Sequence, residues 1–112
     1  MLTPGDVVDL DLGMPSGSEA GLRRPAVVVT AARVLQGGPN VVQVVPLTRT
    51  IRHSGVEVVI DPDELNRLEA RSSAQCQQVR SIASTRIHDR TGNIGPVLLG
   101  EVRDTLALLL DL

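Results

Sequence analysis

The chain has 112 residues, which fits one domain spanning residues 1–112. Its formal net charge of −2 and pI near 5.6 argue against a protein that coats nucleic acid through bulk positive charge, although a local basic cleft is compatible with them. The chain has no Phe, Tyr or Trp, so its core must come from aliphatic residues and no RNA base can stack on one of its side-chain rings.

Cysteine content and the N-terminus indicate where the protein works. Cys76 is the only cysteine, which excludes an intrachain disulfide and a thiol-rich metal site. The opening MLTPGDVVDL lacks the basic region and apolar run of a secretory signal, and no apolar run is long enough to span a bilayer. We therefore expect a reducing, cytoplasmic location and no membrane partner.

Three segments organise the first third of the chain. Asp6–Leu12 alternates apolar and acidic residues, which predicts a half-buried strand. Gly13–Leu22 is rich in Gly, Ser and Pro and predicts a long loop. Pro25–Ala31 is a continuous, largely β-branched run, so a strand buried on both faces is expected there.

The middle of the chain continues in strands. A turn at Gln36–Asn40 precedes a strand at Val41–Leu47. Pro46 cannot donate to a ladder, which predicts that this end lies at a sheet edge or a strand exit. A polar loop at Thr48–Ser54 then leads into a strand at Gly55–Ile60.

The last part of the chain ends in a helix. Asp61–Leu65 predicts a short helical turn, Ala74–Ala83 a strand, and Ser84–Arg90 a turn of helix. Asn93–Gly95 fits a last short strand. From Pro96 the spacing becomes helical, with an apolar face predicted for Val97, Leu98, Val102, Leu106, Leu109 and Leu110. The fold class expected is mainly β with a C-terminal α-helix, as a small, partly open barrel or strongly bent sheet.

The common motifs of phosphate-binding loops, dinucleotide sites, zinc proteases and serine hydrolases are missing. His53 and His88 have no Cys or carboxylate at zinc-ligand spacing, so we expect neither a metal nor another cofactor. Cys76 lies within a strand pattern, where an inert buried thiol is favoured over a nucleophile.

Polar residues gather where the predicted strands end. They are Glu19, Arg23 and Arg24 before the second strand; Thr48, Arg49, Arg52 and His53 after the third; and Gln75, Gln77 and Gln78 around the strand at 74–83. If the strands at 25–31 and 41–47 pair antiparallel, Arg24 and Thr48 reach the same end of the sheet. Guanidinium and hydroxyl groups together suit a phosphodiester, although exposed Arg and Thr also decorate ordinary loops.

Four motifs in register resemble the MazF/PemK toxin family. The strongest is Gly17-Ser18-Glu19, a short gap, and then Arg24-Pro25-Ala26-Val27-Val28. The others are Gly5-Asp6-Val7-Val8-Asp9-Leu10, Val44-Val45-Pro46-Leu47-Thr48, and Gln78-Val79-Arg80-Ser81-Ile82-Ala83. The order and spacing hold from Pro4 to the terminal helix.

The resemblance implies an SH3-like barrel of the CcdB/PemK/MazF type with a C-terminal helix, usually a homodimer. It implies the toxin of a type II toxin–antitoxin system, a metal-independent, sequence-selective endoribonuclease that acts on single-stranded RNA. The implied partner is a cognate antitoxin that blocks the RNA groove. The surplus leucines of the terminal helix, beyond those needed to cover the core, hint at the same dimer or partner contact.

The family's functional positions map onto this chain. Arg24 and Thr48 match the catalytic positions, and Glu19 matches an acidic loop residue tied to the active site. The chemistry implied is attack by the ribose 2′-OH on the adjacent phosphorus, which leaves a 2′,3′-cyclic phosphate and a 5′-OH. The RNA-binding candidates are Arg23, Arg49, Arg52, His53, Gln75, Gln77 and Gln78.

One position departs from the family pattern. Several members carry an acid, proposed as the general base, where this chain has Gln77, and an amide cannot act as a carboxylate base. Glu19 or His53 could replace it, or positioning alone could suffice. A catalytically weak binding module therefore stays open, as does a CcdB-like gyrase poison, although the Trp-Gly-Ile end of that family is missing here.

Overall fold

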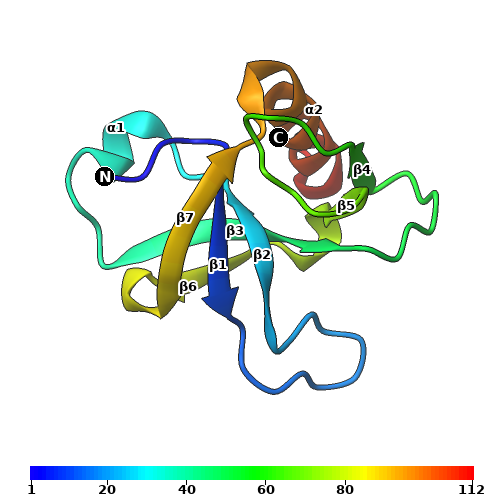
Figure 1. The fold of residues 1–112 in the computed structure, drawn as a ribbon, viewed down its shortest axis with the longest axis horizontal. Coiled ribbons are helices and arrows are strands. Elements are labelled where there is room, and N and C mark those ends of the chain that lie inside the picture. The colour runs from blue at the N-terminus through cyan, green and yellow to red at the C-terminus, as the bar shows by residue number, and fades with distance from the viewer.

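Seven antiparallel strands and a C-terminal helix form the protein in a computed structural model that describes residues 1–112 (Figure 1). The strands are β1 (Asp6–Asp11), β2 (Arg23–Val28), β3 (Val41–Thr48), β4 (Glu57–Ile60), β5 (Ser72–Gln75), β6 (Arg80–Ala83) and β7 (Ile87–Asn93). The helices are α1 (Ala32–Leu35) and α2 (Gly95–Leu110), and two 3-10 turns are η1 (Cys76–Gln78) and η2 (Ser84–Arg86).

The strands follow the order β4-β5-β3-β2-β1-β7, and β6 also pairs with β3. The two end strands of this order are not paired with each other, so the sheet bends into a barrel-like shape without closing. In Figure 1, α2 lies beside β4 and β5, and α2 contacts β4 and the 3-10 turn η1. The expected class, mainly β with a C-terminal helix, is confirmed.

Strand β3 lies inside the sheet, so of the two positions predicted from Pro46, a sheet edge or a strand exit, the sheet edge is wrong. One side of β3 pairs with β2, and the other pairs with β6 up to Val44 and with β5 from Leu47. Pro46 falls between these two partners, where the ladder is interrupted and a missing N–H is tolerated. The proline therefore marks the place where β3 changes partner.

Two apolar clusters fill the molecule, one on each face of the central strands. The first includes Val27 and Val45 and is covered by Leu99 and Val102 of α2. The second is built from the alternate residues of the same strands, such as Val28 in β2. Both faces of β2 are thus buried from Ala26 to Val28, as its continuous apolar run predicted.

Several boundaries differ from the prediction. The segment 74–83 is two strands separated by η1, because β5 and β6 pair with opposite ends of β3 and the chain must turn between them. The turn of helix expected at 84–90 covers only η2, and of the strand expected at 93–95 only Asn93 lies in β7, since Ile94 caps α2 and Gly95 begins it. Helix α1 was not predicted.

The apolar face of α2 is also shifted from the prediction. Leu99 and Val102 are buried, whereas Val97 and Leu110 point to solvent. No helix in the structure combines the length and the apolarity needed to cross a bilayer.

Candidate functional site

Arg24 and Thr48 belong to strands β2 and β3, whose predicted antiparallel pairing is confirmed. Ala26 lies opposite Pro46 in this ladder, so continuing the register by two residues places Arg24 opposite Thr48. Strand alternation puts both side chains on the same face as Ala26 and Pro46. The structure therefore brings a guanidinium and a hydroxyl to one end of the sheet.

Three more polar residues extend this face across the next two strands. Thr48 pairs with Ser73 of β5, and Gln75 of β5 pairs with Glu57 of β4. The alternate residues of these strands, including Ala74 and Val58, belong to the core under α2. We call the opposite side, made of Arg24, Thr48, Ser73, Gln75 and Glu57, the polar face.

Glu57 is the centre of hydrogen bonding on the polar face. Its carboxylate accepts from the Ser73 hydroxyl, from the Ser54 backbone N–H at 2.7 Å and from the Arg52 N–H at 3.4 Å. The Ser73 hydrogen bond is the main cause that lowers the pKa of Glu57, and the Ser54 and Arg52 amides add to it. Glu57 is consequently an ionised anchor for the loop that follows Thr48.

Gln75 places an unpaired acceptor under the same face. Its side chain is only 8% exposed, and its Oε1 has no hydrogen-bond partner. Buried polar atoms are nearly always paired in folded proteins, so an orphaned amide oxygen is a position that a bound donor would stabilise.

The loop at 13–22, which contains Glu19, is bonded to Arg24 at Gly21. Arg24 Nε donates to the Gly21 carbonyl at 3.0 Å, and Glu19 Oε1 accepts from the Ser16 N–H at 3.1 Å. A Cβ at Gly21 would lie 2.5 Å from Pro15, so only glycine fits this turn. The loop is therefore folded against the side chain that the sequence marks as catalytic.

Gln78 fastens this loop to η1. Its Oε1 accepts from the Ala20 N–H at 3.0 Å, and its Nε2 donates to the Ser18 carbonyl at 2.8 Å. Both polar atoms of the amide are engaged within the chain. Gln78 thus holds the backbone on both sides of Glu19, a different role from the RNA contact predicted for it.

Two of the predicted arginines are engaged in ion pairs. Arg23 pairs with Asp9 at 2.7 Å, and this hydrogen bond lowers the pKa of Asp9 and raises that of Arg23. Alternation along β2 sends Arg23 to the face opposite Arg24. Arg49 pairs with Glu69 at 3.0 Å in an exposed contact that binding could readily exchange.

The other predicted contacts are exposed. Arg52 and His53 lie in the loop after β3, where His53 has a left-handed φ of 54°. Gln77 is exposed in η1, next to Gln78. None of these three side chains is buried, so all remain open to a ligand.

Sequence reasoning did not single out Glu57, Ser73 or Arg80. Half-buried Arg80 follows η1 and donates to the Leu12 carbonyl at 3.4 Å. The sequence held one signal for Glu57, since it is the only charged residue in the otherwise apolar run Val56–Ile60. The roles of Ser73 and Arg80 required the pairing of β3 with β5 and β6.

Cys76 is fully buried, and burial raises the pKa of its thiol to about 11. This agrees with the inert thiol favoured from the sequence, because the thiolate is the nucleophile. The residue packs in the core under α2.

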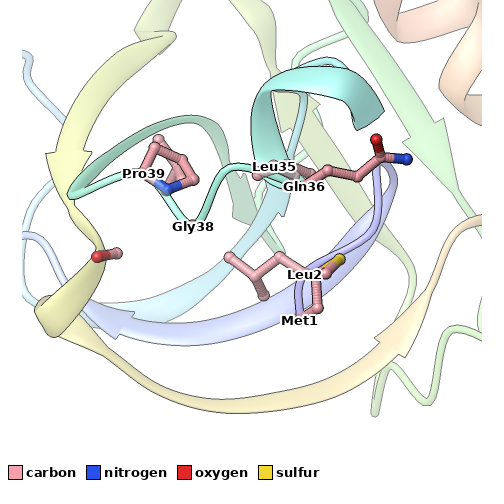
Figure 2. Close-up of a pocket in the computed structure, with 8 residues that line it drawn as sticks. Met1, Leu2, Leu35, Gln36, Gly38 and Pro39 are labelled. Atoms are coloured by element: carbon pink, nitrogen blue, oxygen red, sulfur yellow. The ribbon is translucent and has the colours of Figure 1, made fainter.

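An apolar hollow of about 210 Å³ lies away from these residues, beside α1 (Figure 2). Its lining includes Met1, Leu2, Leu35 and Val42 and has no charged side chain. It therefore lacks the groups that hold a phosphodiester.

Known proteins resemble this chain along its length. Residues 3–110 match the family described as PemK-like, MazF-like toxin of type II toxin-antitoxin system. Endoribonuclease MazF9 of Mycobacterium tuberculosis (strain ATCC 25618 / H37Rv) is 34% identical over 119 residues, covering 100% of this chain and 98% of that protein.

Solved structures share the fold. MazF (Form-I) from Deinococcus radiodurans gives a TM-score of 0.79 at 27% identity, covering 97% of this chain and 96% of that one. An endoribonuclease in complex with its cognate antitoxin, from a Mycobacterial species, gives 0.80 at 20% identity, covering 100% and 97%.

Proposed function

Because this chain belongs to the PemK-like, MazF-like toxin family of type II toxin–antitoxin systems, we propose that it is an endoribonuclease that cleaves single-stranded RNA at selected sequences. The observation that carries the proposal is the antiparallel register of β2 and β3, which, continued by two residues from Ala26 and Pro46, sets Arg24 opposite Thr48. A relative 34% identical over its full length is named an endoribonuclease, which supports the same activity.

The chemistry that we propose needs no metal. The ribose 2′-OH attacks the adjacent phosphorus, the P–O5′ bond breaks, and the products are a 2′,3′-cyclic phosphate and a 5′-OH. Arg24 stabilises the charge that develops on the phosphorane and protonates the leaving oxygen. Thr48 donates to a non-bridging oxygen, so that fixed charge and dipoles provide the main catalytic effect.

The general base is the open element of this mechanism. Glu19 is the acidic residue nearest to Arg24 in the sequence. The loop that contains Glu19 is also bonded to Arg24 through Gly21. Gln77 lies exposed in η1 but carries no titratable group. We therefore assign Glu19 to the site as base or as an orienting group, and expect slower cleavage than in relatives with an acid at position 77.

Because the chain has no aromatic side chains, we expect it to recognise RNA bases through hydrogen bonds instead of stacking. The orphaned Gln75 oxygen is an acceptor for an amino group, while Arg49, Arg52 and His53 on the loop after β3 offer donors. Gln77 offers both. We withdraw Arg23 as a direct RNA contact because it pairs with Asp9 on the other face.

Two protein partners belong to the proposal. An antitoxin is expected because a structural neighbour was solved with its cognate antitoxin. A homodimer is expected because α2 leaves apolar side chains uncovered, among them Val97 and Leu108, which are 77% and 74% exposed. Light scattering at micromolar concentration tests the dimer, and a monomer there would contradict it.

The direct test incubates the purified protein with a long single-stranded RNA in EDTA and maps the new ends. We expect discrete cuts with 5′-OH ends. Arg24→Ala should lower cleavage by about 10³-fold, as loss of a group that stabilises transition-state charge commonly does. Arg33→Ala, an exposed arginine on α1, is the matched control.

Intact RNA from the folded wild-type protein would contradict the endoribonuclease proposal. Retained antitoxin binding in that case would identify a binding module that has lost its base at position 77. A cleaving, folded Arg24→Ala variant would leave the activity in place and remove Arg24 from its catalytic role.

A further inference from the structure

We propose that Glu57 is a positioning residue for RNA recognition, which holds the loop of residues 49–55 in its RNA-binding conformation. The inference rests on the proposed function, because it gives Glu57 an effect on RNA through the loop that carries Arg49, Arg52 and His53. Glu57 lies at the start of β4, on the polar face that also holds Arg24 and Thr48.

Both carboxylate oxygens of Glu57 are used to hold the chain together. Oε1 accepts from the Ser54 N–H at 2.7 Å, and Oε2 accepts from the Ser73 hydroxyl and from the Arg52 N–H at 3.4 Å. One side chain thus joins β5 to two backbone amides of the loop. The amides that it binds flank His53 on both sides.

The loop needs such an anchor because its backbone is otherwise weakly held. At its start, the Thr50 N–H donates to the Thr48 hydroxyl at 3.2 Å. His53 has a left-handed φ of 54°, a region that non-glycine residues seldom occupy. Hydrogen bonds to a charged acceptor on either side of His53 offset the cost of that conformation.

The same geometry argues against Glu57 as the missing general base. Both oxygens of Glu57 already accept hydrogen bonds within the chain, so taking a proton from RNA would compete with the contacts that hold the loop. Its hydrogen bonds also lower its pKa, which makes it a weaker proton acceptor. The role of Glu57 therefore depends on the length of its side chain and on the position of its acceptor oxygens.

Two conservative variants distinguish a positioning role of Glu57 from a role that depends on its charge. Glu57→Gln keeps the length of the side chain, so its oxygen still accepts from Ser54 at 2.7 Å while its amide nitrogen faces Ser73, and only the longer contact to the Arg52 N–H is lost. Glu57→Asp keeps the charge but is one methylene shorter, and its carboxylate is drawn back from the loop amides. Glu64→Ala, an exposed acid in the turn after β4, is the control.

The experiment measures RNA cleavage kinetics and hydrogen exchange of the Arg52 and Ser54 amides in the full chain. We expect Glu57→Asp to raise KM about tenfold, to change kcat less than about threefold, and to speed exchange at both amides about tenfold, since each hydrogen bond to a charged group contributes roughly that factor. Glu57→Gln should stay within about threefold of wild type in cleavage and in exchange at the Ser54 amide, while the Arg52 amide, which loses its acceptor oxygen, exchanges faster.

An active Glu57→Asp with an inactive Glu57→Gln would overturn the proposal and give Glu57 a role that depends on charge. Two variants that both behave as wild type would also overturn it. If the wild-type protein leaves RNA intact, the proposed function fails, and the exchange rates still decide separately whether Glu57 holds the loop.

Discussion

The side-chain oxygen of Gln78 accepts a hydrogen bond from the backbone N–H of Ala20 at 3.0 Å, across 58 positions of sequence. The nitrogen of the same amide donates to the Ser18 carbonyl, so the backbone on both sides of Glu19 is tied to η1. The loop before β2 and the turn after β5 thereby become parts of one site.

Removing the Gln78 amide should loosen the Glu19 loop. Gln78→Ala removes both hydrogen bonds, and we expect faster hydrogen exchange at residues 16–21 and about tenfold slower RNA cleavage, with little change in unfolding temperature. Gln36→Ala, an exposed glutamine at the end of α1, is the control. Unchanged exchange at Ala20 would show that the loop is held by other contacts.

An acid at position 77 should restore a proton acceptor. Gln77 is exposed, so Gln77→Glu adds a carboxylate without burying charge. We expect faster cleavage above about pH 5, where a solvated glutamate is ionised, or a changed base preference at the cut. Rates and end-mapping on one RNA measure both. Gln36→Glu adds the same charge elsewhere. Equal effects of the two variants would mean that the added negative charge, and not its place at position 77, changes the rate.

The buried carboxylate of Asp6 should be a main stabilising group. Asp6 is fully buried and accepts from the Thr3 N–H at 2.7 Å, from Asn93 Nδ2 at 3.0 Å and from Arg90 Nε at 2.9 Å. Asp6→Asn replaces an acceptor by a donor in this network, and we expect a loss of about 2–4 kcal/mol in the free energy of unfolding by urea.

The control for this change is Asp104→Asn on the exposed side of α2, which should alter the free energy of unfolding by less than about 0.5 kcal/mol. Equal stabilities of the two variants would mean that water or a rearranged Asn93 replaces the lost contacts.

The thiol of Cys76 should be inert in the folded protein. Its pKa is raised to about 11 by burial, so about one thiol in a thousand is ionised at pH 8, and the side chain is closed to solvent. We expect no reaction with a thiol reagent at pH 8 under native conditions and one equivalent after unfolding in guanidinium. Rapid native labelling would place Cys76 in a mobile or accessible position.

Local sequence signals were enough for much of the fold. The patterns at Asp6–Asp11, in β2, in β3 and in α2 predicted that these elements exist, because burial leaves a trace in the residues themselves. The half-buried strand expected from the first pattern is wrong, since β1 is buried on both faces between the two apolar clusters. Strand β7 was missed because its residues are mostly exposed and polar, which leaves no such trace. The break at η1 was missed because only the partners of β3 require it.

By itself, the sequence determined the family, through motifs that keep their order and spacing, and the antiparallel pairing of the strands that carry Arg24 and Thr48. Tertiary structure alone decided which polar side chains share a face with them. Gln78 holds a loop 58 positions away, and Glu57 bonds to Ser73 16 positions away. Such contacts depend on strand register and on how the chain folds back on itself, which no local sequence pattern encodes.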